Sequence, residues 1–196
     1  MRRRSFLVAL VFSTLSFLAS AESAFAKSTM SEVFASTFRT TYVANQCGTN
    51  IMNLVKQASQ AGVDVSNASI VQITNKGNFN FGMVGAFQAR EEGPRYQTPV
   101  NGFKFAPGLT SWYFHVVLEQ DGLIFDYDFG NEPLVLPAAA YFEAMLLPEQ
   151  KWQMGSKITP RAERLAQYQV SIFPAADSLS GQRSKPTDVS LETYLQ

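Results

Sequence analysis

The chain contains one cysteine, Cys47, and one histidine, His115, among its 196 residues. A single cysteine cannot form an intramolecular disulfide, and this pair cannot supply the ligands of a usual zinc site. The acidic stretch at residues 126–132 lacks the ligand spacing of an EF-hand calcium loop. We therefore expect no bound metal, and we expect no other cofactor. Chemistry that requires a thiolate and an imidazole has one candidate for each.

The chain also lacks an excess of charge of either sign, because 16 basic residues balance 16 acidic residues. This balance argues against an overall basic surface, so we expect no nucleic acid as a partner. Hydrophobic residues make up 46% of the chain and aromatic residues 13%. A sizeable core is therefore expected, and disorder throughout the chain is excluded.

An export signal is predicted at the N-terminus. Three arginines at positions 2–4 precede an uncharged apolar run at positions 6–18, which is too short to span a bilayer comfortably. Small residues at positions 24 and 26 form a cleavage site. We expect residues 1–26 to be removed and the mature protein to be periplasmic or secreted, without stable membrane association. The alternative is an uncleaved anchor, and a twin-arginine pattern at positions 3–7 leaves the export route open.

The mature chain mixes helical and strand patterns, which predicts one α+β domain at residues 27–185 and a polar C-terminal tail at residues 186–196. Helices are expected to begin after a capping box at Thr29, near Asn45, at Ala138 and at Pro160. Strands are expected at residues 69–74, 79–87, 112–119, 123–129 and, last, 168–173. Residues 175–196 are polar, and we expect them to be partly loose.

Cys47 is a candidate nucleophile because of its place in the chain. It lies in a polar, turn-forming stretch at residues 45–50 that leads into apolar positions with helical spacing, and Asn45 is the expected N-cap. Cys47 therefore falls in the first turn of a helix. There the unpaired backbone N–H groups and the positive end of the helix dipole favour a thiolate. Inert burial in the core is the ordinary alternative for a lone cysteine.

His115 is predicted to lie beside two carboxylates on a β-hairpin. Asp121 and Gly122 separate two apolar runs, which indicates a two-residue turn. With ideal pairing from that turn, His115 lies directly opposite Asp128, and Asp126 is a diagonal neighbour on the same face. Either carboxylate is a candidate to orient the imidazole.

These residues supply the parts of a catalytic triad. A thiol nucleophile needs a base to deprotonate it, and the base needs an acceptor that orients it. Cys47 on a helix and His115 with an aspartate on a sheet give the arrangement of papain-like and transglutaminase-like hydrolases. The alternative is a core cysteine and a structural histidine that share no chemistry.

Several segments resemble the protein N-terminal glutamine amidohydrolases. They are Cys47-Gly48-Thr49-Asn50-Ile51-Met52-Asn53-Leu54, Ile73-Thr74-Asn75-Lys76, Trp112-Tyr113-Phe114-His115-Val116-Val117-Leu118 and Ile124-Phe125-Asp126-Tyr127-Asp128. The pattern Trp-x-aromatic-His-Val-Val-Leu is the most specific of them. The likeness covers most of residues 42–185.

The resemblance implies a papain-like or transglutaminase-like α+β fold and a Cys-His-Asp hydrolase. Such an enzyme converts glutamine at a protein or peptide N-terminus to glutamate and releases ammonia. Carried over by position, Cys47 is the nucleophile, His115 the base and Asp126 the orienting acid. Asp128 is the second choice for that acid, or a carboxylate that binds the substrate's α-amine. We expect a monomer that acts on a peptide or protein containing glutamine.

The remaining site residues are expected around this triad. The side chains of Gln46 and Asn45 are candidates to stabilise an oxyanion together with backbone N–H groups. Trp112, Tyr113 and Tyr127 are candidates to line the substrate pocket. Two other function classes stay open. One is a cysteine peptidase or transglutaminase-like acyltransferase, and the other is a non-enzymatic exported binding protein on the same scaffold.

Overall fold

A computed structural model describes residues 28–43, 46–76, 84–87, 109–112, 114–128, 133–146, 160–182 and 184–196. These residues form an α+β structure with a main antiparallel sheet and helices packed against it. The predicted α+β class is therefore confirmed. The predicted export signal at residues 1–26 lies outside the described residues.

The secondary-structure elements alternate along the chain. The strands are β1 (Ala68–Asn75), β2 (Val84–Phe87), β3 (Leu109–Trp112), β4 (His115–Gln120), β5 (Leu123–Asp126), β6 (Leu134–Pro137), β7 (Tyr168–Pro174) and β8 (Thr187–Ser190). The helices are α1 (Met30–Thr41), α2 (Cys47–Gln60), α3 (Ala138–Met145), α4 (Arg161–Gln167), α5 (Ala175–Ser180) and α6 (Leu191–Tyr194). Among the described residues, every helix is too short or too polar to cross a lipid bilayer.

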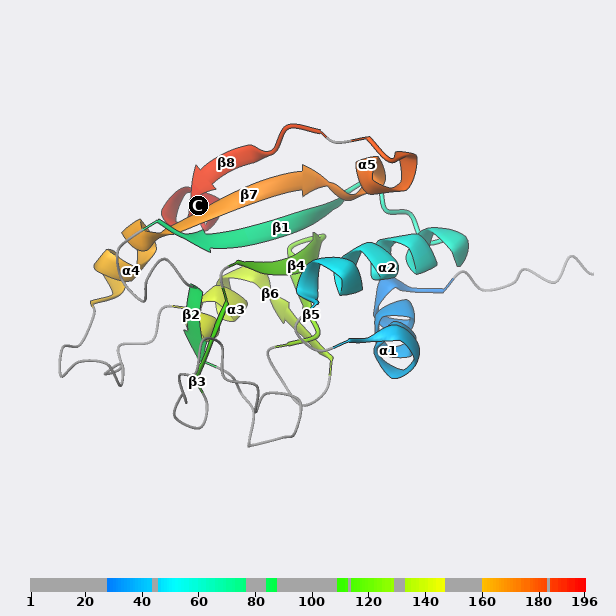
Figure 1. Ribbon diagram of the computed structural model, residues 1–196, viewed down its shortest axis with the longest axis horizontal. Coiled ribbons are helices and arrows are strands. Elements are labelled where there is room, and N and C mark those ends of the chain that lie inside the picture. Colours follow the sequence, from blue (N-terminus) through cyan, green and yellow to red (C-terminus); the bar gives the residue numbers. More distant parts are fainter. Residues whose placement is uncertain are drawn as a thin grey trace, which may run out of the picture.

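Within the described residues, six strands form the main sheet in the order β6-β5-β4-β1-β7-β8 (Figure 1). All of the neighbouring strands in it are antiparallel. The strands β2 and β3 pair only with each other and form a second, two-stranded sheet. The expectation that residues 79–87 continue the main sheet is therefore wrong for residues 84–87, and residues 79–83 are not described.

The expected hairpin is present, and its strands β4 and β5 lie between β1 and β6 in the main sheet. Gln120 pairs with Leu123, as a two-residue turn requires, and the turn residues Asp121 and Gly122 have φ values of 53° and 76°. Positive φ at both central residues is the signature of a type I′ turn, which suits the twist of the two strands. The strands themselves are shorter than expected, since β4 begins at His115 and β5 ends at Asp126.

Alternating side chains of the central strands divide the core between the two faces of the sheet. On one face, Val116, Leu118 and Phe125 pack against α1 and α2. On the other face, Val117 and Ile124 pack against α3, α4 and α6. The sheet is thus covered on both sides, which buries the strands that carry His115 and Asp126.

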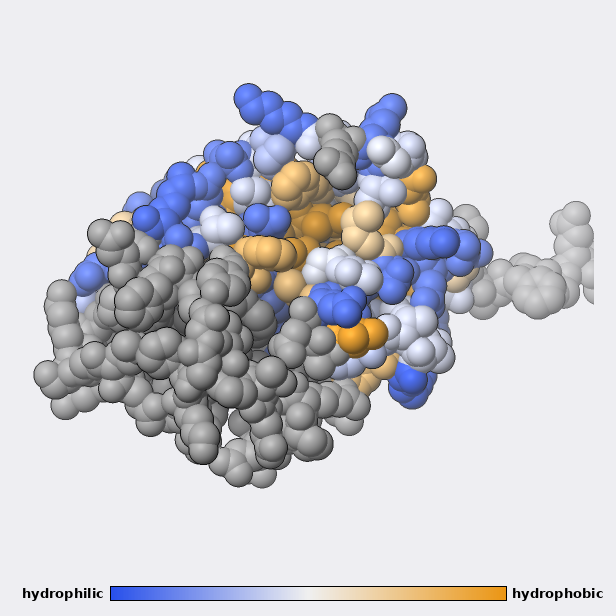
Figure 2. Space-filling model, viewed as in Figure 1, coloured by the Kyte–Doolittle hydropathy of each residue, from blue (hydrophilic) through white to orange (hydrophobic). Residues whose placement is uncertain are grey.

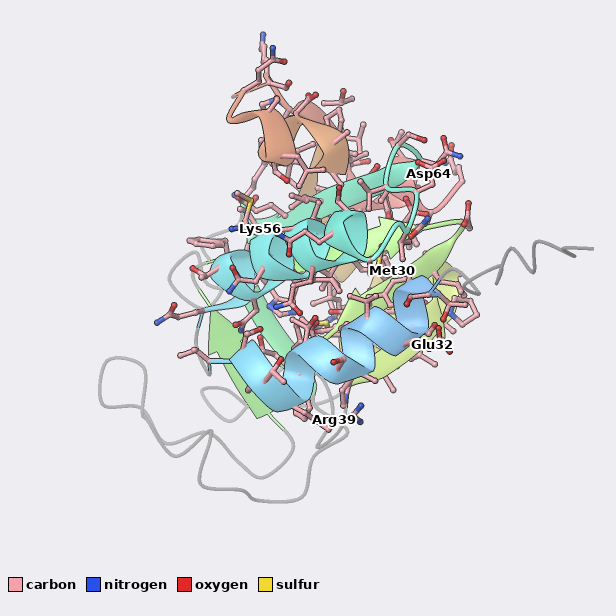
Figure 3. All side chains as sticks on the ribbon, turned by 90° about the vertical axis from the view of Figure 1, so that its right-hand side faces the viewer. Met30, Glu32, Arg39, Lys56 and Asp64 are labelled. Carbon is pink, nitrogen blue, oxygen red and sulfur yellow. The ribbon has the colours of Figure 1, made fainter. Side chains whose placement is uncertain are left out.

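The two N-terminal helices lie side by side against one face (Figure 3). The capping box predicted at Thr29 begins α1, because Thr29 and Glu32 exchange hydrogen bonds at 3.3 Å and 2.7 Å. Thr37 of α1 donates a hydrogen bond of 3.1 Å to Gln57 of α2. Gly62, which follows the C-cap residue of α2, has a φ of 79°, which glycine adopts without strain.

The C-terminal segment is part of the fold, so the expectation of loose residues after position 175 is wrong. The strand β8 pairs with β7 at the sheet edge, and Leu191 at the start of α6 is buried in the core. Ser190 caps α6 by accepting a hydrogen bond of 3.0 Å from the backbone of Thr193. The polar composition of this segment reflects an edge strand and short helices with one face in water.

Apolar side chains also reach the surface on the face seen in Figure 1. In the space-filling view they gather beside α2, over the strands β1 and β7, with hydrophilic side chains around them (Figure 2). Phe173 of β7 is one of the half-buried residues that pack against the core under α2. The helix therefore covers the centre of the sheet more completely than its β7 side.

The packing of α2 leads to a stability prediction. Leu54 is fully buried between α2 and the sheet, so Leu54→Ala removes core contacts and should lower the free energy of unfolding by about 2–5 kcal/mol. Met52 lies on the same helix with 47% exposure, so Met52→Ala should change the free energy of unfolding by about 0.5 kcal/mol or less. Urea unfolding measures both values. Equal losses in the two variants would contradict the assigned packing of α2.

Candidate active site

Cys47 is the first residue of α2, and this end of the helix meets the sheet at β4 (Figure 1). A Cβ atom placed on the next residue, Gly48, would lie 4.0 Å from Cγ2 of Val116. Cys47 itself is buried, with 8% exposure. Helices leave the backbone N–H groups of their first turn without acceptors inside the helix, so these groups are available near the thiol.

The cap of α2 differs from the prediction. Gln46 is the N-cap residue, its side chain makes no capping hydrogen bond, and the expected cap Asn45 lies outside the described residues. The start of the helix is instead held by Asn50, whose side-chain amide donates to Val43 O at 2.7 Å. Its carbonyl oxygen accepts from Val43 N at 3.0 Å. Asn50 is buried, and this pair of bonds ties the backbone of Val43 to the first turn of α2.

His115 and Asp126 are joined by a buried hydrogen bond. Nε2 of His115 lies 2.9 Å from Oδ2 of Asp126, and the two side chains are 0% and 1% exposed. His115 is the first residue of β4, and Asp126 is the last residue of the neighbouring β5. The hairpin therefore supplies both groups from adjacent strand ends.

The carboxylate opposite His115 is not the one that ideal pairing predicts. Pairing between β4 and β5 runs from Gln120 and Leu123 only as far as Leu118 and Phe125. The chain then bends after Asp126, so the extrapolated pairing of His115 with Asp128 is wrong.

Asp128 is also buried, and it accepts a hydrogen bond from the hydroxyl of Tyr42. Its backbone N–H donates to Oδ1 of Asp126 at 2.7 Å. Asp128 thus helps to hold the carboxylate of Asp126, which is the one hydrogen-bonded to the imidazole.

The second oxygen of Asp126 has two donors. The hydroxyl of Tyr141, in α3, donates to Oδ2 at 2.6 Å, and the imidazole approaches the same oxygen. Burial alone would raise the pKa of Asp126. The charge and hydrogen bond of His115, the Tyr141 hydroxyl and the Asp128 backbone outweigh that effect and lower the pKa of Asp126. The carboxylate is therefore stabilised in its charged form.

Cys47 and His115 interact although they come from opposite faces of the sheet. His115 pairs with Ile73, which belongs to the core on the α3 face, whereas Cys47 belongs to the core on the α2 face. His115 lies beyond the last pair between β4 and β5, which is Leu118 with Phe125. Since Asp126 takes Nε2, Nδ1 is the ring nitrogen that remains for the thiol.

The environment of His115 favours an imidazolium. Burial lowers the pKa of His115, and this is the largest single effect. The charge and hydrogen bond of Asp126, followed by the hydrogen bond and charge of Cys47, act in the opposite direction. Together they raise the pKa of His115 well above its usual value of 6.5. A raised pKa makes the neutral imidazole a stronger proton acceptor, and its charged form attracts a neighbouring anion.

Of the three predicted pocket residues, Tyr127 is the one whose side chain the structure describes. Tyr127 is buried, stacks on Phe34 at 4.2 Å between ring centroids, and donates to the carbonyl of Phe34 at 3.3 Å. It is a core residue, so its predicted role as a pocket wall is wrong. Phe34 also lines a groove of about 550 Å³ between α1 and β6, which includes none of the three candidate triad residues. Trp112 ends β3 with its side chain undescribed, and Tyr113 lies outside the described residues.

Three residues of the site were missed by the sequence analysis: Asn50, Tyr42 and Tyr141. Asn50 had a usable signal, because it is a polar residue at a position that the helical spacing assigns to the buried face. The contacts of the two tyrosines with the aspartates had no signal in the local spacing, since Tyr42 lies at the end of α1 and Tyr141 in α3. Gln46 is exposed beside Cys47, and its predicted oxyanion role stays a prediction.

No protein-family model matches this chain, and no curated protein matches it. In the part of the chain that the structure describes, no group of three or more histidine, cysteine, aspartate or glutamate side chains is arranged to hold a metal ion. Function must therefore be inferred from the geometry of Cys47, His115 and Asp126.

The charge balance of the site can be measured on a single signal, because His115 is the only histidine in the chain. In protein without a histidine tag, NMR titration should give a pKa for His115 well above 6.5. Asp126→Asn removes the attractive charge and leaves burial dominant, so the pKa of His115 should fall below 6.5.

The matched control is Asp128→Asn, which removes a neighbouring buried carboxylate that accepts its hydrogen bond from Tyr42. It should lower the pKa of His115 less than Asp126→Asn does. The opposite order would mean that Asp128, and not Asp126, is the acid that orients the imidazole.

Proposed function

We propose that this protein is an exported thiol amidohydrolase that deamidates glutamine, with the N-terminal glutamine of peptides or proteins as its substrate. The proposal includes a papain-like or transglutaminase-like arrangement, with the cysteine on a helix and the histidine and aspartate on the sheet. One observation carries it. A buried carboxylate, Asp126, holds the only imidazole of the chain at 2.9 Å, and the only cysteine lies close enough to raise the pKa of that imidazole.

Inert burial of Cys47 is the main alternative, and the surroundings of the thiol speak against it. Cys47 packs in the core on the α2 face, as an inert cysteine does, but it also lies near an imidazole whose partner is a buried carboxylate. Such a pair loses its hydration when it is buried, and hydrophobic residues in its place would often stabilise a fold as well or better. Perturbed titratable groups of this kind cluster at functional sites.

The first half of the proposed reaction forms a thioester. The Cys47 thiolate attacks the carbon of the glutamine side-chain amide, and His115 protonates the departing nitrogen as the C–N bond breaks. Ammonia leaves, and a γ-glutamyl thioester remains on Cys47. Backbone N–H groups at the start of α2, with the side chain of Gln46 or Asn45, are the proposed donors to the oxyanion.

The second half consumes water. His115, now neutral, accepts a proton from a water molecule, whose oxygen attacks the thioester carbon. The C–S bond breaks, glutamate leaves, and the thiolate and imidazolium are restored. Asp126 stays ionised throughout and keeps Nε2 of the imidazole protonated and oriented.

The substrate-binding part of the proposal rests on the surroundings of the triad. Asp128 is a second carboxylate at the site and is the proposed partner of the substrate's free α-amine. Val43 and Phe114 are exposed apolar residues that lie close in sequence to Cys47 and His115. They are the proposed contacts for the residue that follows the glutamine. We further propose that the protein acts as a monomer after removal of residues 1–26.

Ammonia release from synthetic peptides tests this function. Peptides that begin with glutamine should release ammonia faster than N-acetylated copies or peptides with an internal glutamine. Cys47→Ala should lower the rate by at least about a thousandfold, because no other thiol is present. Met52→Ala, an exposed change on the same helix, should leave the rate unchanged.

Other products would decide for the alternatives. New amino termini without ammonia would indicate a peptidase, and incorporation of an added amine would indicate an acyltransferase. Full activity of Cys47→Ala would overturn the proposed nucleophile, and no reaction with any glutamine peptide would favour a binding protein.

A further inference from the structure

Tyr141 and its helix α3 are hydrogen-bonded to the β4–β5 hairpin, which carries His115 and Asp126. Tyr141 lies on α3 with 0% exposure, and its hydroxyl donates to Oδ2 of Asp126 at 2.6 Å. The first residue of α3, Ala138, donates its backbone N–H to the carbonyl of Gly122, in the β4–β5 turn, at 2.9 Å. This bond ties the start of α3 to the β4–β5 hairpin. The hydroxyl of Tyr141 therefore reaches the Asp126 carboxylate from an element that is not part of the hairpin.

Tyr141 is not needed to fix the orientation of the carboxylate. The backbone N–H of Asp128 already holds Oδ1 at 2.7 Å, and His115 already lies 2.9 Å from Oδ2. A third donor on this group mainly changes its charge distribution. A hydroxyl that donates to a carboxylate places a positive dipole end next to it and lowers its attraction for any other positive group.

We propose that Tyr141 limits the basicity of His115 by sharing the oxygen Oδ2 of Asp126 with it. Tyr141 acts on the imidazole through Asp126 and is thus a positioning residue that touches neither substrate nor nucleophile. The effect on His115 holds whatever the protein does. Its consequence for catalysis rests on the function proposed above.

The consequence concerns the second half of the reaction. Hydrolysis of the thioester needs a neutral imidazole to accept the proton of water. A carboxylate with no other side-chain donor would hold the imidazolium more strongly and would delay this step near neutral pH. The Tyr141 hydroxyl offsets part of that attraction.

Tyr141 can fill this role because it keeps its proton. Burial is the largest effect and raises the pKa of Tyr141 well above its usual value, and the charges of Asp126, Asp128 and Cys47 act in the same direction. The other titratable groups around the pair, in the described part of the chain, come from each packed element. They are Cys47 from α2, Asp126 and Asp128 from β5 and the bend after it, and Tyr42 from the end of α1.

Titration of His115 by NMR in the full chain, without a histidine tag, tests the proposal. Tyr141→Phe should raise the pKa of His115 by about 0.5–1 unit, since one hydrogen bond to the paired carboxylate is lost. Tyr127→Phe is the matched control, because Tyr127 is equally buried and its hydroxyl donates to the backbone of Phe34. It should leave the pKa of His115 unchanged. An unchanged or lower pKa in Tyr141→Phe would overturn the proposal.

A second substitution covers the case in which Tyr141→Phe does not fold. A ring-fluorinated tyrosine at position 141 has a more acidic hydroxyl and donates a stronger hydrogen bond. It should therefore lower the pKa of His115, and an unchanged or raised value would overturn the proposal equally.

The pH profile of ammonia release separates this inference from the proposed function. In Tyr141→Phe the rise of activity with pH should move to higher pH by the same amount as the NMR value. If Tyr141→Phe shifts the pKa of His115 but no protein releases ammonia, the proposed function is wrong and the role of Tyr141 is supported. If ammonia is released but the pKa of His115 does not shift, the proposed function is supported and the role of Tyr141 is wrong.

Discussion

The hydrogen bond between His115 and Asp126 is the interaction on which the site depends. Both groups are buried, and a buried charge is unfavourable unless it is paired and hydrogen-bonded. The carboxylate meets this condition with three donors, namely the imidazole, the hydroxyl of Tyr141 and the backbone of Asp128. The charged carboxylate in turn stabilises the protonated form of the imidazole and so raises the pKa of His115. A higher pKa makes His115 a stronger base for the adjacent Cys47.

Three parts of the chain converge on this pair, and ordinary packing fixes each of them. The apolar face of α2 packs on the sheet and brings Cys47 to β4. The β4–β5 hairpin carries the imidazole and the carboxylate on adjacent strand ends. The opposite face of the sheet holds α3, from which Tyr141 reaches the carboxylate. Because helices and strands hold all of these groups, the geometry of the site is as rigid as the core around it.

Local signals in the sequence predicted the local structure, and the remaining features depend on distant contacts. The capping box of α1, the turn at residues 121–122 and the triad candidates can be read from neighbouring residues. The preference for Asp126 over Asp128 came from the resemblance, and ideal strand pairing favoured Asp128, because the outcome depends on where strand pairing stops. The edge strand at residues 187–190 has a polar pattern without a clear strand signal, and Tyr141 lies far from Cys47 in the sequence.

The rate at which iodoacetamide alkylates Cys47 in the native protein tests the central claim most directly, since no other thiol competes. A thiol that transfers its proton to His115 should react readily at neutral pH. Replacing the imidazole in His115→Ala should slow the reaction by about tenfold or more, because only the thiolate is nucleophilic. Equal rates in both proteins, or no labelling of either until they are unfolded, would contradict a coupled thiol and imidazole.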